Sequence, residues 1–576
     1  MTKWIKRGNA NSVRTYLLEI GIDPIKLTNA QETPPEWLGG MTDVAKHIAG
    51  AIVNNEHITV FGDYDADGEC ATAILWLLLE ALGTNMRNVT IRLPKRFSEG
   101  YGINEKAIDE FHKGLIICID NGIAAHDAIQ KAIDNGFKVV VLDHHLAPEG
   151  ELIKAHAIVD QHSEILRNNI DKNFIPGRRQ ISDPSEAFID YCGAGLALKL
   201  AQYMLPNNEE TEILLDKMTA IAAIATVADS VSLVGENRII VKKGLALINK
   251  ALKGEKDKVT LGLLSILKEL GVKEMRDEDI AFKLAPIMNA PARLNDDGAR
   301  LPCAAICQDK KEIPHIAQEL IELNTLRKSM QVDAIKRAEE LITEISAPII
   351  VFDPEGSKGL IGIVAGQLAE QYKLPAVVFA LSEDQTTWDG SMRTYGSIHI
   401  KDCLDKVSDT LKRYGGHAGA AGLGIAVGDE VKFATAIKEV MKDIQPADES
   451  GNNISYYDLD ITIDEVPGIL AQMNEYGPFG QDVPAPVIRI SGVKAANGYG
   501  GKYGFLMGAM NQHIKFEATQ KTRPGERKTK IILLGFNLAE KYLEMGGPQI
   551  FDVVGTLGYK NDNYGKAIQL NMVDFC

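Results

Sequence analysis

Three carboxylates follow an apolar run near the start of the chain and stand two residues apart. The run covers residues 58–61, and the carboxylates belong to Asp63, Asp65 and Asp67. Carboxylates this close repel one another and take up protons unless cations neutralise them. The pattern therefore predicts a divalent-cation site, with an Asp-rich solvated turn as the alternative while these residues are considered alone.

Two further apolar runs end in residues of the same chemistry. Residues 115–119 precede Asp120, and residues 139–142 precede Asp143, His144 and His145. Helix-like stretches separate the three runs, which predicts parallel strands joined by right-handed crossovers. Such strands end at one edge of the sheet, where ligands bind, so these side chains are expected to converge. Carboxylates with one or two imidazoles and no nearby thiolate suit Mn²⁺ or Mg²⁺ better than a structural zinc.

The three motifs resemble those of the DHH phosphoesterase superfamily, and the detailed match is to its RecJ branch of single-strand-specific 5′ to 3′ exonucleases. The resemblance covers about residues 40–490 without a missing block. It is carried by segments 63–68, 96–103, 120–122, 142–145, 225–230, 286–294 and 413–422. Two positions depart from the RecJ pattern, because Ile287 replaces an arginine and Ala292 a glycine. A phosphate contact is expected to be missing there.

The resemblance implies a set of metal ligands and a set of substrate contacts. Ser391 and Arg393 match the positions that hold the 5′ end, since a hydroxyl and a guanidinium suit a terminal phosphate. A surface salt bridge is the alternative for Arg393. The implied metal ligands are Asp63, Asp65, Asp67, Asp120, His144 and Asp229, and the implied catalytic residues are Asp65, Asp67, Asp120, His144, His145 and Asp229. The implied substrate-binding residues are Arg96, Tyr101, Asn289, Arg293, Ser391, Arg393, Gly415, Gly416 and His417.

Our mechanistic hypothesis is two-metal hydrolysis of a phosphodiester, in which Asp120 bridges two Mn²⁺ or Mg²⁺ ions and a metal-bound water attacks. His145 would orient the ligands or donate to the phosphate. Anchoring the 5′ end would release mononucleotides stepwise from single-stranded DNA, in DNA recombination and repair. Two other classes stay open: a DHH phosphodiesterase that acts on short oligoribonucleotides or cyclic dinucleotides, and a non-catalytic replication scaffold.

The composition gives no direct sign of a nucleic-acid partner. The chain has 576 residues, 45% of them hydrophobic, and a formal net charge of −16. Binding DNA would therefore require a local basic groove. No long apolar stretch or signal-peptide core is present, which predicts a cytoplasmic protein without a membrane partner. We expect a monomer that works with a single-stranded-DNA-binding protein or a helicase, and seven reduced cysteines.

The order of elements predicts an α/β protein with several domains. We expect an N-terminal arm at 1–40 and a DHH catalytic domain with a parallel sheet at 41–314. A long connecting helix at 315–346 would lead to a second α/β, DHH-associated domain at 347–450. Short strands at 455–576 predict a small OB-like β-barrel that binds nucleic acid.

Two further segments carry expectations of their own. Glycines near the start of a predicted helix at 192–200 would let its backbone approach a phosphate or another helix. In the β-barrel, aromatic and basic side chains suit single-stranded DNA, with an exposed hairpin over an aromatic core as the alternative. These side chains are Tyr499, Tyr503, Phe505, Lys515, Lys521, Arg523, Arg527, Lys528 and Lys530.

Overall fold

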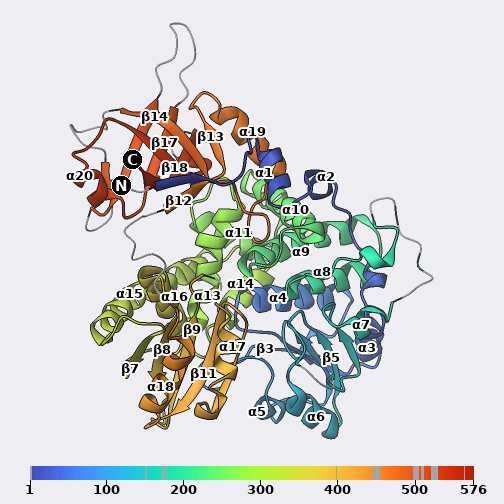
Figure 1. Ribbon diagram of the computed structural model, residues 1–576. Helices are drawn as coiled ribbons and strands as arrows, with labels where there is room; N and C mark the ends of the chain where they lie inside the picture. Colours follow the sequence, from blue (N-terminus) through green and yellow to red (C-terminus); the bar gives the residue numbers. More distant parts are fainter. Residues whose placement is uncertain are drawn as a thin grey trace.

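Three domains, each built on its own β-sheet, make up the chain (Figure 1). The computed structural model describes residues 3–148, 152–170, 174, 177, 180–396, 398–444, 454–496, 505–507, 511–519, 530–562 and 565–576. The predicted α/β fold class is confirmed, with a parallel sheet, a connecting helix, a second α/β domain and a C-terminal β-domain. No helix in these residues combines the length and apolar character needed to cross a membrane.

The first sheet is fully parallel. Its strands are β3 (Val89–Arg92), β2 (His57–Phe61), β4 (Gly114–Ile119), β5 (Lys138–Leu142) and β6 (Ala157–Val159), in that order. The central strands are continuous apolar runs because helices cover both faces of the sheet. In the strand register Phe61 pairs with Cys118, and Ile119 pairs with Leu142. Strands β2, β4 and β5 therefore end together, directly before the motif residues.

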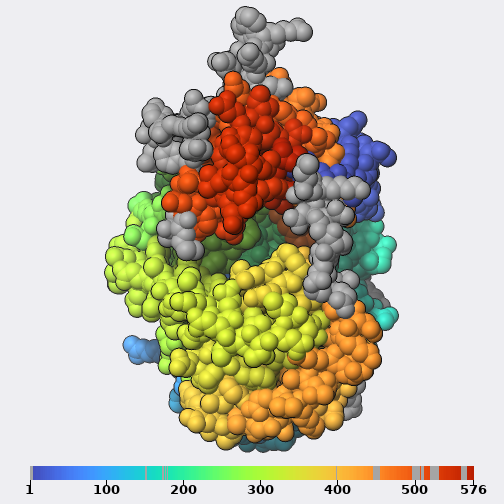
Figure 2. All heavy atoms as spheres, turned by 60° about the vertical axis from the view of Figure 1, so that its left-hand side comes forward, coloured from blue at the N-terminus to red at the C-terminus, as the bar shows by residue number. Residues whose placement is uncertain are grey.

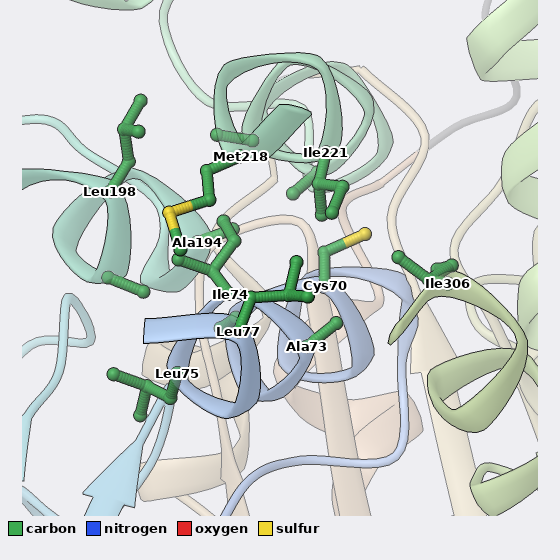
Figure 3. Packing of buried hydrophobic residues seen from close by; sticks show 14 of the residues in the cluster. Cys70, Ala73, Ile74, Leu75, Leu77, Ala194, Leu198, Met218, Ile221 and Ile306 are labelled. Carbon is green, nitrogen blue, oxygen red and sulfur yellow. The ribbon is translucent and has the colours of Figure 1, made fainter. Parts of the chain in front are cut away.

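Helix α4 (Ala66–Ala81) lies at the centre of this domain and is apolar on nearly every side. Its neighbours are α8 (Gly193–Met204), α9 (Glu209–Ala228), α13 (Ala285–Leu294) and α14 (Arg300–Cys307), and the same core includes α3 (Met41–Val53), α10 (Gly235–Leu252) and α11 (Leu261–Glu269). Figure 3 shows Cys70 and Ile74 of α4 among Ala194 of α8, Met218 of α9 and Ile306 of α14. A helix enclosed in this way is held along its whole length, which fixes the position of its first turn. The opposite face of the sheet is covered by α5 (Glu105–Ile108) and α6 (His126–Asp134).

The second domain follows the long helix α15 (Pro314–Leu341). Its sheet contains β10 (Arg413–Gly416), β11 (Ala420–Ala426), β9 (Thr387–Arg393), β8 (Ala376–Leu381) and β7 (Ile349–Asp353), in that order. Only β7 and β8 run parallel, so the sheet is mixed. The helices of this domain are α16 (Ile361–Tyr372), α17 (Ile400–Asp405) and α18 (Glu430–Met441). Figure 2 shows α15, in lime, between the red C-terminal domain and the orange part of the second domain.

The C-terminal domain is a sheet that closes on itself. Its order is β13 (Leu459–Ile461), β14 (Ile488–Ala496), β18 (Ile550–Asp562), β19 (Gly565–Phe575), β17 (Lys530–Gly535), β16 (His513–Thr519) and β15 (Phe505–Met507), and β14 also pairs with β16. Two helices, α19 (Val466–Tyr476) and α20 (Ala539–Glu544), pack on it. Of the proposed DNA-binding side chains, Lys515 lies on β16. The other proposed side chains lie outside the described residues. They are Tyr499, Tyr503, Lys521, Arg523, Arg527 and Lys528, together with the side chains of Phe505 and Lys530.

The N-terminal segment packs on the C-terminal domain. Strand β1 (Lys3–Lys6) pairs in parallel with β12 (Ile454–Tyr457), and both chain ends are seen beside this domain in Figure 1. The guanidinium of Arg7 donates two hydrogen bonds of 2.8 Å to the carboxylate of Asp458, which is 2% exposed. Helices α1 (Val13–Glu19) and α2 (Pro24–Thr28) add apolar side chains to the core of this domain.

The chain then crosses to the first domain, where Thr33 contacts the buried ion pair of Lys199 and Glu236. The backbone N–H of Thr33 donates to Glu236 Oε2 at 2.7 Å, and Lys199 Nζ lies 2.6 Å from Glu236 Oε1. Both charged side chains are at most 2% exposed. The first thirty-odd residues thus link the two domains by contacts as well as by the chain.

We expect Arg7→Met to loosen the N-terminal segment, because it leaves the buried Asp458 carboxylate without its cation. The cost should be about 1–3 kcal/mol, felt mainly at the β1–β12 pair. Hydrogen exchange of the amides at 454–461 measures the effect. Arg14→Met on the exposed side of α1 is the control, and equal exchange in both variants would contradict the role of Arg7.

Candidate metal centre

The turn after β2 is built around the first turn of α4. Asp65 is the N-cap of this helix, and its Oδ1 accepts hydrogen bonds from the N–H groups of Asp67 at 3.0 Å and Gly68 at 3.1 Å. A Cβ at Gly68 would lie 2.5 Å from the backbone N of Asp63, so only glycine fits. From α13, Asn289 Oδ1 accepts the N–H of Ala66 at 3.0 Å. Asn289, expected to bind substrate, thus clamps the acidic turn in this structure.

The start of α8 holds the carboxylate of Asp67. The N–H groups of Gly193 and Ala194 donate to its two oxygens at 2.6 and 2.8 Å. A helix N-terminus favours negative charge at this position. A Cβ at Gly193 would lie 2.5 Å from the Cβ of Asp120. The glycine expected to approach a phosphate or another helix therefore approaches two acidic side chains.

Asp120 leaves the end of β4 in a left-handed backbone conformation, with φ at +61°. The conformation is held by its neighbour, because the Asn121 amide donates to Phe61 O at 3.2 Å and Ile119 O at 2.9 Å. Strain of this kind persists where the surroundings impose it, and it is common at functional sites. It places the Asp120 carboxylate 3.0 Å from His144 Nε2.

Asp143 holds the loop that carries both imidazoles. Its Oδ1 accepts the backbone N–H of His144 at 2.8 Å and lies 2.8 Å from His145 Nδ1. Its Oδ2 accepts the N–H of Ile123 at 2.9 Å. Sequence reasoning did not assign this residue a role, although it is the first residue of the Asp-His-His triplet. Its oxygens face the protein, so it positions the imidazoles.

The acidic and imidazole side chains converge at this edge of the sheet. His144 Nε2 lies 3.6 Å from Asp67, 3.0 Å from Asp120 and 3.7 Å from Asp229, which caps the end of α9. Three groups of ligand atoms each fit within 4.8 Å: Asp63 with Asp65 and Asp120, Asp67 with His144 and Asp229, and Asp120 with His144 and His145. Asp120 and His144 each belong to two groups. All of the expected ligands are thus near one another.

Acidic side chains outnumber the positive groups at this centre. Burial and then the neighbouring carboxylates raise the pKa of Asp63 and Asp120 well above its usual range, and raise that of Asp229 to about 9. Burial opposes a charged His145, but its hydrogen bond and charge interaction with Asp143 raise its pKa to about 9. Asp63 Oδ1 is buried without a hydrogen-bond partner in the described residues. The centre therefore suits hard divalent cations, because it offers carboxylate oxygens and negative charge, and one of its buried carboxylate oxygens has no hydrogen-bond partner in the described residues.

Tyr101 and Arg96 lie beside the centre. The hydroxyl of Tyr101 donates to the carbonyl of Asp120 at 3.1 Å and contacts the His145 ring at the same distance. The guanidinium of Arg96 lies over the ring of Tyr64, 4.6 Å from its centroid. The loop of Arg96 is anchored by Asp296, which accepts the N–H of Phe97 at 2.7 Å. Asp296 has no recognisable sequence signal of its own.

Two arginines of the expected substrate site come from different domains. Arg293 Nη1, on α13, donates to the carbonyl of Gly359 at 3.3 Å. Arg393 Nη1, on β9, donates to Ser391 Oγ at 2.8 Å. Burial and then neighbouring guanidinium groups, including those of Arg96 and Arg393, lower the pKa of Arg293 to about 9. Cations of both domains thus gather at the interface, which is the local basic region that the net charge conceals.

The remaining expected residues have mixed positions. Gly415, Gly416 and His417 are exposed at the end of β10, and none of the hydrogen bonds in the described residues joins them to the acidic centre. Ile287 is 4% exposed and belongs to the main core, and Ala292 packs with Leu93. The two departures from the RecJ pattern are therefore packing positions in this chain.

We expect the metal-free protein to lose stability as the pH rises towards about 9. The folded state keeps a proton on Asp229 up to about 9, whereas an unfolded carboxyl loses it near 3.8, and folded His145 likewise keeps its proton beyond 6.5. Each group therefore contributes stability at low pH that is lost as the pH rises through its folded pKa. Thermal midpoints in EDTA should fall by a few degrees between pH 6 and 9.

Divalent cations replace these protons, so Mn²⁺ should raise the midpoint more at pH 9 than at pH 6. In EDTA, the fall of the thermal midpoint with pH should be smaller in Asp229→Asn than in the unaltered protein. This comparison distinguishes the effect of the acidic centre from the general effect of the negative net charge. A midpoint in EDTA that is constant or rising over this range would contradict the assignment.

Segments of the chain match three families of known domains. Residues 57–226 match the DHH family, N-terminal domain, residues 341–443 the DHHA1 domain, and residues 457–574 the RecJ OB domain. The single-stranded-DNA-specific exonuclease RecJ of Bacillus subtilis (strain 168) is 29% identical over 587 residues, or 99% of this chain and 67% of the relative. RecJ of Salmonella typhimurium is 30% identical over 481 residues, or 79% of this chain and 78% of the relative.

Solved structures agree with these matches. RecJ from Thermus thermophilus in complex with Mn²⁺ has a TM-score of 0.73 at 23% identity, over 100% of this chain and 79% of that one, and so shares the fold. An exonuclease RecJ bound to manganese has a TM-score of 0.56 at 27% identity, over 71% of this chain and 96% of that one. The chain belongs to the RecJ family of single-stranded-DNA-specific exonucleases.

Proposed function

We propose that this chain is a metal-dependent exonuclease that degrades single-stranded DNA from its 5′ end to mononucleotides. The observation that carries the proposal is the position of Arg96 beside the turn that carries the acidic residues. Tyr64 stands between Asp63 and Asp65 in the chain, and Arg96 lies 4.6 Å from the centre of its ring. A phosphate held by the arginines would thus have a neighbouring phosphodiester bond within reach of the acidic centre.

Two divalent cations, Mn²⁺ or Mg²⁺, are the proposed cofactors, and the manganese-bound relative supports this choice. One ion would be held by Asp63, Asp65 and Asp120, and the other by Asp67, His144 and Asp229, with Asp120 near both. When bound, the ions neutralise the acidic cluster, polarise the phosphoryl oxygens and lower the pKa of water. We retain Asp65, Asp67, Asp120, His144, His145 and Asp229 as the catalytic residues.

His145 is suited to act as a donor to the phosphate. Although burial opposes the charged form, its hydrogen bond and charge interaction with Asp143 raise its pKa and so favour the protonated ring, and Asp143 and Tyr101 hold the ring in place. A protonated imidazole stabilises negative charge that develops on a phosphoryl oxygen. Tyr101 is 50% exposed, which leaves its ring available to the substrate.

Ser391 and Arg393 are proposed to bind the 5′ phosphate at the start of α16. A Cβ at Gly362 would lie 2.8 Å from Arg393 Nη2 and 3.1 Å from Ser391 Oγ, so the helix start and these side chains are in close contact. A hydroxyl, a fork of N–H donors and a helix N-terminus together suit a phosphate. The exposed residues Gly415, Gly416 and His417 are proposed to contact the DNA strand farther along.

The cellular setting is also a proposal. We propose that the protein is a monomer that acts in the cytoplasm, in DNA recombination and repair. A single-stranded-DNA-binding protein or a helicase would supply the DNA strand. The C-terminal barrel is proposed to hold the strand outside the active site, which its match to the RecJ OB domain supports.

We expect Asp65→Ala and His144→Ala to lower the rate of hydrolysis at least about 10³-fold, because each removes a proposed cation ligand. End-labelled single-stranded DNA, duplex DNA, short oligoribonucleotides and cyclic dinucleotides should be tested side by side with added Mn²⁺. Asp127→Ala and His126→Ala, at the start of α6 and in none of the three groups of ligand atoms, are matched controls that should retain activity. Hydrolysis by purified, folded Asp65→Ala would defeat the ligand assignment.

Gly193→Ala should reduce both Mn²⁺ affinity and turnover by tenfold or more, because the new methyl group displaces Asp120. The overlap predicted for this methyl group is with backbone and Cβ atoms, which cannot move cheaply. Gly50→Ala in α3 is the control, since its methyl group would meet nothing within 4 Å. Calorimetric titration with Mn²⁺ measures the affinity. Unchanged affinity in Gly193→Ala would show that the close approach of Gly193 to Asp120 is unimportant.

A further inference from the structure

A fourth arginine is buried at the same interface and has not been given a role. Arg327 lies on α15 and is 8% exposed. The buried side of α15 packs against α13, which carries Arg293, and against α16, whose start contacts Arg393. Arg327 is also close enough to Arg293 to affect its pKa. Arg327 thus adds a fourth guanidinium group to the arginine cluster.

Among the described residues, the guanidinium of Arg327 donates hydrogen bonds only to neutral oxygens. Its Nε and Nη2 donate to Asn324 Oδ1 at 3.3 and 2.8 Å, and its Nη1 donates to Gln331 Oε1 at 2.7 Å. These bonds fix the orientation of the fork and leave its charge uncompensated. A guanidinium carries five N–H donors, so two remain for another acceptor.

The whole cluster lacks a counter-charge. Among the residues that the structure describes, no carboxylate lies within 4.0 Å of the guanidinium nitrogens of Arg96, Arg293, Arg327 or Arg393. Arg337, ten positions further along α15, shows the usual arrangement, with its Nη2 3.2 Å from Asp353 Oδ2. Buried charges are normally paired, so a site with several unpaired guanidinium groups is built for an anion from outside.

We propose that Arg327 is a specificity-determining residue that favours a 5′-terminal phosphate over a 5′-hydroxyl. This inference rests on the proposed function, in which Ser391 and Arg393 bind the 5′ end. A terminal phosphate carries about −1.5 to −2 charges near neutral pH, whereas each internal phosphodiester carries one. Arg393 alone matches the single charge of a diester, so the further guanidinium groups of Arg293 and Arg327 favour the more highly charged monoester.

The experiment compares two single strands of identical sequence, one with a 5′-phosphate and one with a 5′-hydroxyl. Binding is measured by fluorescence anisotropy in EDTA, where no hydrolysis occurs, and kcat and KM are then measured with Mn²⁺. The full-length variants are Arg327→Met, Arg327→Gln and Arg327→Lys. Arg337→Met is the matched control on the same helix, since its guanidinium has a carboxylate partner.

We expect Arg327→Met to weaken binding of the 5′-phosphorylated strand about tenfold or more and to change binding of the hydroxyl strand less than about twofold. Arg327→Lys should keep part of the discrimination because it keeps the charge, and Arg337→Met should keep all of it. If the methionine variant does not fold, the glutamine variant, which can still hydrogen-bond Asn324, gives the same readout.

Equal weakening of both strands, or no change in their ratio, would overturn the role of Arg327. Arg393→Met separates this failure from a failure of the proposed function. If Arg393→Met abolishes the discrimination and every Arg327 variant retains it, only the inference about Arg327 is wrong. If the unaltered protein does not distinguish the two strands, anchoring of the 5′ phosphate is wrong, and the inference falls with it.

Discussion

Mutual repulsion among buried carboxylates is the constraint on which the site depends. Asp63, Asp67 and Asp120 are each at most 2% exposed and lie together at one edge of a parallel sheet. Burial and repulsion both oppose the ionisation of Asp63 and Asp120, so the fold is stable with this cluster only if protons or cations occupy it. Divalent cations relieve the repulsion among these carboxylates, so the repulsion that destabilises the metal-free fold also favours cation binding.

The surrounding structure serves to keep these acids in place against that repulsion. The start of α8 donates two N–H groups to Asp67, and Asn121 holds the strained turn at Asp120. Asp143 is fully hydrogen-bonded to backbone and to His145, and therefore positions the imidazoles. The side chains that orient the site are thus as specific as the ligands themselves, as in other metal centres.

The opposite electrostatic problem exists a short distance away, at the interface of the two α/β domains. Arg96, Arg293, Arg327 and Arg393 gather there, although the chain as a whole carries a net charge of −16. The arginines make the electrostatic potential positive at the interface, and the acids make it negative at the metal centre. A phosphate bound by the arginines would place the next phosphodiester near the acidic centre. Net charge, a sum over the whole surface, says little about such a site.

The parallel sheet, the order of the domains and most of the acidic centre could be predicted from the amino-acid sequence. This was possible because buried strands are continuous apolar runs and because Asp65, Asp120 and His144 each follow such a run closely. The sequence did not indicate that residues 3–28 pack on the C-terminal domain, that Gly193 approaches Asp120, that Asn289 clamps the Asp65 turn, or that Arg327 joins the arginines. These points became visible in the folded chain, because each is a contact between segments far apart in the sequence. Local periodicity and motif spacing carry no record of which distant surfaces meet.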